Sequence, residues 1–226
     1  MAYQWDFTPV VDNAPLLAQG LVNTLKVTGV ALAGGLALGL GLALLRLSRH
    51  RLASLPAGLV IEVFRTTPPL VQLFWFFFAL PLIVGIEMTP FMAAIVTFSI
   101  QSAAFFAEVF RGGIVSVERG QWDGALAIGM SRRQALRRIV LPQAVKRMIP
   151  AFMERAIELM KTTTLVATIA YADLLFEANE IAQKTFRPLE TFTVAALIYF
   201  VVILAFSLLA RMFERRVAVS GESTVH

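Results

Sequence analysis

Four long stretches without a charged residue constrain the fold of this 226-residue chain more than any other feature. Each is 19 to 21 residues long: Val27 to Leu45, Thr66 to Ile86, Met88 to Ala107 and Thr191 to Ala210. About 20 residues of α-helix cross a hydrocarbon core roughly 30 Å thick. Very apolar helices in a soluble core are the alternative, but a mean hydropathy of +0.72 and 18 phenylalanines favour an all-α integral membrane protein.

A fifth span is expected to begin at Pro150, because proline lacks an N–H and has the fixed φ of a first helical turn. Four charged residues follow, at positions 154, 155, 158 and 161, and only Thr162 to Ala172 is free of charge. Charge that faces lipid is costly, so we expect the charged part of this span to face protein, water or lipid headgroups.

The lysines and arginines predict the orientation of these spans. Fourteen of the chain's 20 lie in three segments, with three in Arg46 to Arg51, eight in Arg111 to Arg147 and three in Arg211 to Arg216. The first 25 residues have none, and Asp173 to Glu190 has two. By the positive-inside rule, five crossings place the N-terminus outside and the C-terminus in the cytoplasm. The lack of a basic n-region argues against a cleaved signal peptide.

Composition also limits the chemistry that the chain can perform. Basic membrane flanks account for the pI of about 10.1, so the expected neighbour is membrane lipid and no nucleic acid is needed to explain it. The sequence has no cysteine, which excludes disulfides and thiol chemistry. It has no glycine-rich phosphate-binding loop ending in Gly-Lys-Ser/Thr, so we expect no ATP hydrolysis and no enzyme activity on this chain. No cofactor or metal is expected.

Residues 112–149 form the largest hydrophilic segment, with five arginines between Arg119 and Arg138. Ser131 and Gln134 have the spacing of a capping box, in which the serine side chain caps a helix and the glutamine returns to the serine N–H. From the spacing alone, a basic hairpin attracted to anionic lipid is one interpretation of this segment.

A helix–corner–helix arrangement is predicted inside this segment. A short helix is expected from Trp122 to Ile128, and Gly129 is the natural residue for a left-handed corner after it. We expect the capped second helix to stop before Pro142, because proline disfavours helix at the preceding residue. The candidate buried positions are Leu126, Ile128, Met130, Leu136 and Ile139.

The stretch GQWDGALAIGMSRRQALRRIVLPQA, which begins at Gly120, resembles the EAA loop of the membrane subunits of binding-protein-dependent ABC importers. The family pattern places an acidic residue and two alanines before a glycine, then Leu-Pro after a long spacer. EVFRTTPPLVQLFWFF, AFFAEVFRGGIVSVERGQ and AFMERAIELMKTTTL are similar to the polar amino acid permease branch, and the resemblance covers roughly residues 16–211. Asp123 and Gly124 replace the glutamate and first alanine of the triplet, and Thr162 replaces a usual aspartate.

The resemblance implies a type I ABC importer permease, with one transmembrane domain over residues 1–226 and a cytoplasmic coupling loop at residues 112–149. In the family this loop docks in a separate ATPase subunit, present in two copies. The permease pairs with a second, identical or homologous, permease subunit in the bacterial inner membrane, and an extracytoplasmic binding protein delivers the substrate. The residues implied in ATPase coupling are Asp123, Gly124, Ala125, Gly129, Leu141 and Pro142.

Substrate contacts are expected on the third span. Gln101, Phe105 and Glu108 are spaced i, i+4 and i+7, so they share one helix face, with Ser102 beside them. The carboxylate of Glu108 suits the ammonium group of an amino acid, and in the family an Ala-Glu pair lies near the transport site. The structural alternative is that Glu108 pairs with Arg111 at i+3.

The paired prolines Pro68 and Pro69 have two interpretations. They break a helix where it lines a cavity, or they mark a helix start at the cytoplasmic interface, with Glu62 and Arg65 paired outside. The interfacial interpretation is the one we favour.

A charged face precedes two further candidate substrate contacts, Thr163 and Thr164. Glu154, Glu158 and Lys161 are spaced i, i+4 and i+7. They either line the path or form a buried ion-pair ladder that holds subunits or the coupling loop together.

Two other patterns predict structure rather than chemistry. Ala31, Gly35, Gly39 and Ala43 recur every four residues, a small-residue face that is weak support for a dimer seam. A short amphipathic helix is expected between Leu174 and Ile181, on the outer side, where an importer receives its binding protein.

Together these patterns predict the permease subunit of an ATP-driven importer of polar amino acids. A secondary transporter or channel that uses its carboxylates for ion coupling is one alternative. A non-transporting scaffold whose basic loop recruits a cytosolic partner is another. Dependence on ATP separates the importer from the secondary transporter, and substrate flux separates both from the scaffold.

Overall fold

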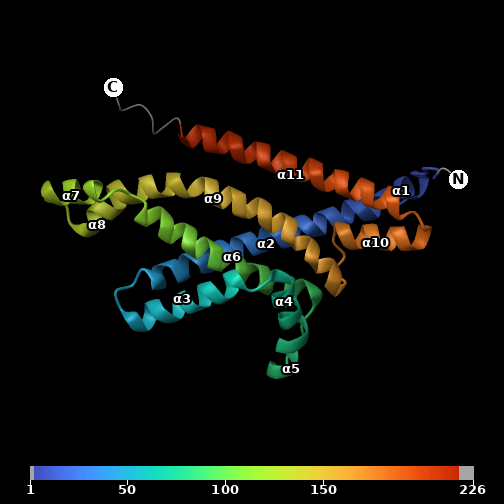
Figure 1. The fold of residues 1–226 in the computed structure, drawn as a ribbon, viewed down its shortest axis with the longest axis horizontal. Coiled ribbons are helices and arrows are strands. Elements are labelled where there is room, and N and C mark those ends of the chain that lie inside the picture. Colours follow the sequence, from blue (N-terminus) through green and yellow to red (C-terminus); the bar gives the residue numbers. More distant parts are fainter. Residues whose placement is uncertain (1–2, 219–226) are drawn as a thin grey trace. The chain divides into compact units, whose positions relative to one another are not determined.

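The computed structural model describes residues 3–218, with side chains as far as Met212. Figure 1 follows the chain from α1 to α11. No strand occurs in the described range, and three helices are long and apolar enough to cross a membrane: α2 (Ala14–Arg46), α6 (Pro90–Val115) and α11 (Pro188–Ala218) as far as Met212. Counting each of two interrupted helix pairs as one span raises the number to five, the number expected from the sequence. The basic side chains expected in the tail after Arg211 lie outside the described residues.

The remaining elements are shorter or interrupted. They are α1 (Thr8–Asp12), α3 (Arg51–Thr66), α4 (Pro69–Phe74), η1 (Trp75–Ala79), α5 (Leu80–Val84), α7 (Arg119–Ala127), α8 (Arg132–Ala135), η2 (Leu136–Val140), α9 (Leu141–Thr162), η3 (Thr163–Ile169) and α10 (Leu174–Thr185). The segments η1 and η2 are π-helical, and η3 is a 3-10 helix. α10 contains the short helix that the sequence predicted after Asp173, whose side chain accepts a hydrogen bond from the Phe176 N–H at 2.8 Å.

The chain divides into two compact units. The first contains the chain up to Gly34, Thr67–Ser99 and Ala156–Phe206. The second contains Gly35–Thr66, Ile100–Arg155 and the chain from Ser207. Four helices, α2, α6, α9 and α11, run from one unit into the other, so each unit contains parts of the same long helices.

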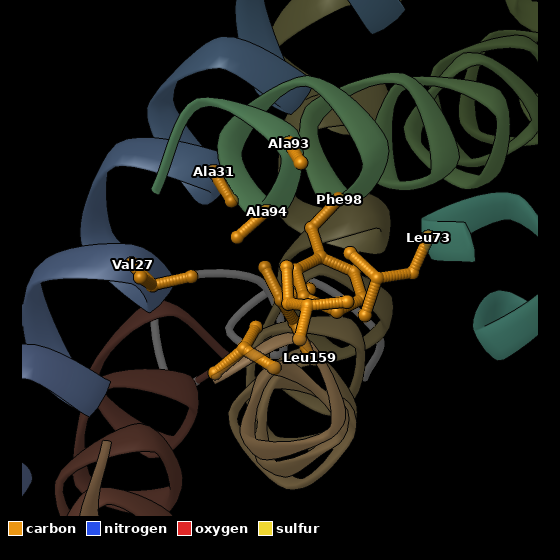
Figure 2. Packing of buried hydrophobic residues seen from close by; sticks show 9 residues of the cluster. Val27, Ala31, Leu73, Ala93, Ala94, Phe98 and Leu159 are labelled. Carbon is orange, nitrogen blue, oxygen red and sulfur yellow. The ribbon is translucent and has the colours of Figure 1, made fainter. Parts of the chain in front are cut away.

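The core of the first unit combines large and small side chains. Leu73 from α4, Phe98 from α6 and Leu159 from α9 are fully buried and converge in Figure 2. Ala31 and Ala94 are also fully buried and contribute only methyl groups to the same cluster. Small residues let helix backbones approach closely, which is the packing that holds helices together in lipid.

The small-residue face of α2 packs within this chain. Ala31 and Ala43 are 0% and 1% exposed. In the second unit, a Cβ added to Gly39 would come within 2.9 Å of the Ala103 carbonyl oxygen on α6. The face that the sequence linked to a dimer seam therefore holds α2 against α6.

Two Leu-Pro pairs each follow a π-helical segment. η1 comes directly before Leu80 and Pro81, and η2 comes directly before Leu141 and Pro142. A proline in an α-helix lacks one donor, and its ring clashes with the carbonyl four residues earlier. A π-helical turn changes the hydrogen-bonding register of the helix before the proline, because its hydrogen bonds span five residues and not four. The helix expected to stop before Pro142 therefore continues into α9.

The expectation that a span begins at Pro150 was also wrong. Pro150 lies inside α9, nine residues after the helix begins at Leu141, and does not start a span. The Pro68 and Pro69 pair behaves as predicted in that it starts a helix: Pro68 is the N-cap of α4, and Pro69 is its first residue. Glu62 and Arg65, which precede this pair, approach each other to 3.9 Å.

Candidate functional site

The predicted corner between α7 and α8 is formed by hydrogen bonds over a few residues. Gly129 has a φ of +85°, the left-handed conformation expected of it. The Gly129 N–H donates to the Leu126 carbonyl at 3.0 Å, and the Met130 N–H donates to the Ala125 carbonyl at 3.1 Å. These two bonds are the Schellman pattern that ends a helix at a glycine. The corner therefore depends on a residue that adopts positive φ without strain.

The capping box after the corner is confirmed. The Gln134 N–H donates to Ser131 Oγ at 3.3 Å, and the Ser131 N–H donates to Gln134 Oε1 at 2.8 Å. Both orphan donors at the start of α8 are satisfied locally, which fixes the direction in which α8 leaves the corner.

A small core supports the corner. Val140, Ala144 and Met148 are buried, and Trp122 from α7 packs half-buried against them together with Leu136. The Gln143 amide donates to the Gln121 side-chain oxygen at 3.2 Å. The two short helices and the start of α9 therefore form one packed cluster.

The outer surface of the corner differs from the prediction. Leu126 and Ile128 were expected to be buried, but their exposed fractions are 39% and 74%. Met130, Leu136 and Ile139 are half-buried. Exposed aliphatic side chains at the end of a helix make an apolar surface that the described residues of the chain do not cover.

The coupling residues named from the sequence lie on this cluster. Ala125 is buried, whereas Asp123, Gly124 and Gly129 are exposed on α7 and at its end. The helix begins at Arg119, three residues earlier than predicted, so Asp123 lies in the second turn and not at the positive end of the helix dipole. Leu141 and Pro142 are exposed at the start of α9, which packs against the same core.

On α6, the second unit holds the residues expected to contact substrate. Gln101 and Ser102 are 3% and 0% exposed, and Phe105 is half-buried. Ser102 Oγ has no hydrogen-bond partner among residues 3–218. Buried hydroxyl groups are usually bonded, so this oxygen is available to a ligand or a water.

Glu108 forms the pair that the sequence offered as its structural alternative. Arg111 Nε donates to the two carboxylate oxygens at 3.1 and 2.9 Å, and Nη2 donates to Oε2 at 2.7 Å. Such a forked, charge-assisted pair is stronger and more directional than a single hydrogen bond. The geometry therefore favours the pairing with Arg111 over an unengaged carboxylate.

Arg155 is the functional candidate that the sequence analysis missed. It is 5% exposed, and its guanidinium carbon lies 3.7 Å from the centre of the Phe105 ring. Arg155 Nη2 also approaches Gln101 Oε1 at 3.5 Å. A periodic signal was present, because Met148, Phe152, Arg155 and Leu159 fall at i, i+4, i+7 and i+11 and so place the arginine on an apolar helix face.

The other candidates on α9 and η3 are placed as follows. Glu154, Glu158 and Lys161 are exposed on the surface of this chain, so they do not form a buried ladder within it. Thr163 is fully buried, donates to the Met160 carbonyl at 2.8 Å and lies 3.4 Å from the hydroxyl of Thr28.

Thr164 is half-buried, and its hydroxyl donates to the Lys161 carbonyl at 2.8 Å. Both threonine hydroxyls therefore already bond to the backbone. Thr163 and Thr164 belong to the first unit, whereas Gln101, Phe105 and Arg155 belong to the second.

Comparison with known proteins identifies the family. A family model described as "binding-protein-dependent transport system inner membrane component" matches residues 35–219. The glutamine transport system permease protein GlnP of Escherichia coli (strain K12) is 36% identical over 217 residues, which cover 96% of this chain and 99% of that protein. The glutamate/aspartate import permease protein GltK of Escherichia coli O6:H1 is 35% identical over 223 residues, with 96% and 100% covered.

The fold agrees with this assignment. A crystal structure of an amino acid ABC transporter with histidines contains a chain that is 37% identical, with a TM-score of 0.91, and the match covers 95% of this chain and 100% of that one. The chain therefore belongs to the family of binding-protein-dependent transport system inner membrane components. It is an all-α, multi-pass membrane permease.

Proposed function

We propose that this chain is the permease subunit of an ATP-driven importer of polar amino acids. In this proposal two separate ATPase subunits power it, a second permease subunit completes the path, and an extracytoplasmic binding protein supplies the substrate. Membership of this family and its similarity to glutamine and glutamate/aspartate permeases support this function over a channel or a scaffold.

The observation that carries the proposal is the exposed corner at Gly129. A helix that ends in a Schellman pattern, a capping box directly after it and a packed core beneath it make a rigid knob. Its surface carries exposed aliphatic side chains at Leu126 and Ile128. Rigid apolar anchors with polar surroundings are suited to docking in a pocket of a partner protein. In this proposal that partner is the ATPase. Asp123, Gly124, Leu141 and Pro142 belong to the same proposed coupling surface, and Ala125, the remaining residue named for coupling, is buried.

The proposed substrate contacts are on α6 and η3. Gln101, Ser102 and Phe105 supply an amide, an unbonded hydroxyl and an aromatic face. Glu108 contributes through its carboxylate, which Arg111 orients. Thr163 and Thr164 are proposed as separate contacts in the first unit.

Purification of the tagged chain with its co-expressed neighbours tests the function. We expect an ATPase subunit to co-purify, and we expect the complex in proteoliposomes to take up a polar amino acid only with ATP and loaded binding protein. Uptake driven by an ion gradient in the absence of ATP would instead support a secondary transporter. A complex that binds a cytosolic partner without any flux would support a scaffold.

The proposed topology places the N-terminus and the loop containing α10 outside the cytoplasm. Gln183 is exposed on α10, whereas Ala178 is fully buried, so Gln183→Cys is the suitable probe. The chain has no cysteine of its own, which leaves this thiol as the single site of labelling. It should react with an impermeant thiol reagent in intact spheroplasts, whereas the matched variant Arg133→Cys should react only after lysis. The reverse pattern would invert the topology.

A further inference from the structure

Lys26 is an isolated charge in the long apolar helix α2. The only other charged residue between Ala14 and Arg46 is Arg46 itself, at the far end of the helix. Because an α-helix rises by about 1.5 Å per residue, Lys26 lies about 18 Å from the start of α2. That distance is greater than the reach of a lysine side chain, so the ammonium group does not extend back to the end of the helix.

The last span shows how deep this lysine lies. The charge-free stretch of α11 begins at Thr191, and Tyr199 is eight residues further along, a rise of about 12 Å. The Tyr199 hydroxyl donates to Asp173 Oδ2 at 3.3 Å, and the N–H of the residue after Asp173 donates to Thr24 Oγ1 at 3.2 Å. Thr24 is therefore held beside the apolar part of α11, and Lys26 lies two residues further from the start of α2.

Lys26 has no partner in the described part of the chain. Its side chain is exposed and makes no hydrogen bond or ion pair with any described residue. The two fully buried carboxylates of the same unit are engaged elsewhere: Asp173 accepts from the Phe176 N–H at 2.8 Å, and Glu190 accepts from the Tyr3 hydroxyl at 2.6 Å. Charge that faces lipid is costly, so ionisable side chains at membrane depth almost always face other protein or a water-filled cavity.

The span beside Lys26 is interrupted. η3 is a seven-residue 3-10 helix, Ala170 after it has a φ of +55°, and the helix pair that ends in α10 is bent by 47°. Asn23 Nδ2 donates to the Ala172 carbonyl at 2.8 Å, and Lys26 is one turn further along the same face of α2. Irregular backbone at membrane depth is tolerated where it is buried in protein or lines a cavity, and transporters hold substrates at such interrupted helices.

We propose that Lys26 lies on a water-filled path through the membrane and binds the α-carboxylate of the amino acid substrate. All amino acids share that group whatever their side chain, and the lysine ammonium offers it three N–H donors and the opposite charge. The inference rests on the proposed function and adds to it the residue that receives the substrate's α-carboxylate. An ion pair with a second permease subunit would instead exclude water from the lysine, so the access of water separates the two roles.

A cysteine at position 26 measures that access, because the chain has no cysteine of its own. The permease–ATPase complex in nanodiscs is treated with the anionic reagent sulfonatoethyl methanethiosulfonate, and mass spectrometry measures the modified fraction of this chain. Lys26→Cys should be modified. Leu25→Cys, which replaces an apolar side chain on a different face of α2, should not. An unmodified Lys26→Cys variant, or equal modification of the two, would overturn the inference.

The same variant tests the charge in a complex that is already assembled. Lys26→Cys should lose ATP-dependent uptake about tenfold or more, because hydrogen bonds to charged groups are the strong ones. The cationic reagent aminoethyl methanethiosulfonate adds an ammonium group at the end of a lysine-like chain and should restore uptake, whereas the anionic reagent should not. The unaltered chain treated in the same way reports any effect on the other subunits. No rescue by the cationic reagent, or equal rescue by both, would contradict the role of the charge.

Substitutions give an independent measure of uptake in proteoliposomes with loaded binding protein. Lys26→Gln should lose uptake, while Lys26→Arg should keep most of it and both should retain the ATPase. Lys184→Gln is the matched control, because it removes a lysine of the same unit whose ion pair with Glu180 is exposed, and it should leave uptake unchanged.

The remaining outcomes are also decisive. Unchanged uptake by Lys26→Gln would overturn the inference. Loss of the second permease subunit from both Lys26→Gln and Lys26→Cys would assign the lysine to an ion pair between subunits and would overturn it as well. No ATP-dependent uptake of any amino acid by the unaltered chain would contradict the proposed function itself.

Discussion

Glycines in two regions of the molecule are constrained in opposite ways. On α2, Gly39 has no room: a Cβ there would lie 2.8 Å from Phe106 Cβ and 2.9 Å from the Ala103 carbonyl oxygen. At the corner, a Cβ on Gly124 or Gly129 would meet no other described atom within 4 Å. Gly39 is therefore required by packing inside the chain. Gly129 is required by its positive φ, whereas no contact among the described residues requires a glycine at position 124.

This difference separates two kinds of effect. A side chain added in the packed region should reduce folding stability, because close-packed interiors do not absorb extra volume without strain. A side chain added at the corner should leave the chain folded, because a Cβ there meets no other described atom within 4 Å. Substitutions at these glycines therefore test whether packing or backbone conformation is the constraint in each region.

Gly39→Val should have the largest effect on stability. Its Cβ cannot fit unless α2 and α6 move apart, and overpacking typically costs about 1–3 kcal/mol. The melting temperature of the purified chain in detergent measures the loss. Gly41→Val is the matched control, because a Cβ there meets nothing within 4 Å among the described residues. Equal melting temperatures for the two variants would show that the close approach of α2 and α6 is not what holds them together.

Glu108→Gln tests the ion pair of Glu108 with Arg111. These two side chains are partly exposed, so they are neither packed as tightly as Gly39 nor as open as the corner. If the carboxylate contacts the substrate ammonium, loss of a charge-assisted hydrogen bond of about 1.5–3 kcal/mol should lower uptake about tenfold or more. Uptake by proteoliposomes and thermal melting are measured for Glu108→Gln and for Arg111→Gln. Loss of uptake in the glutamate variant alone indicates a substrate contact. Unchanged uptake with equal loss of stability in both variants would assign Glu108 to the structural pair only.

Gly124→Ala should have the smallest effect on stability, and it should stabilise the chain where Gly39→Val destabilises it. Alanine is favoured over glycine inside a helix by about 0.5–1 kcal/mol, and no described atom obstructs the methyl group. We expect melting to rise slightly and ATPase co-purification to be retained. Hydrogen exchange of α7 amides measures the local gain. A loss of the ATPase with this variant would show that the partner approaches α7 more closely than the surface of this chain indicates.

The corner was predictable from the sequence because its signals are local. The spacing of Ser131 and Gln134 and the single glycine before them specify hydrogen bonds over a few residues, and these bonds form as expected. The proline expectations at Pro142 and Pro150 were wrong, because a π-helical turn and the interior of α9 accommodate them. Rules for proline describe an isolated helix and do not include such a change of register.

The cluster around Phe105 was predictable only in part. The i, i+4, i+7 spacing on α6 gives the shared face of Gln101 and Phe105, but Arg155 is 50 residues away from Phe105 in the sequence. Tertiary packing brings them together, and a sequence taken by itself does not contain that contact. The exposure of Leu126 and Ile128 was also missed, since apolar residues at helical spacing normally face the core of the same chain.

The corner at Gly129 is proposed to couple this permease to a separate ATPase, and two substitutions at that position test this role. Gly129→Val places a β-branched side chain at a φ of +85°, a conformation that costs about 1–2 kcal/mol for residues with a Cβ. Gly129→Asn adds a side chain of similar size that tolerates the left-handed region. ATPase co-purification and ATP hydrolysis stimulated by loaded binding protein are measured for both in nanodiscs. We expect Gly129→Asn to behave like the wild type, while Gly129→Val still inserts and folds, with melting lowered by no more than that penalty, but loses the ATPase or its stimulation. Wild-type stimulation and transport by Gly129→Val would contradict the coupling role of the corner and leave a basic hairpin on the lipid surface as its explanation.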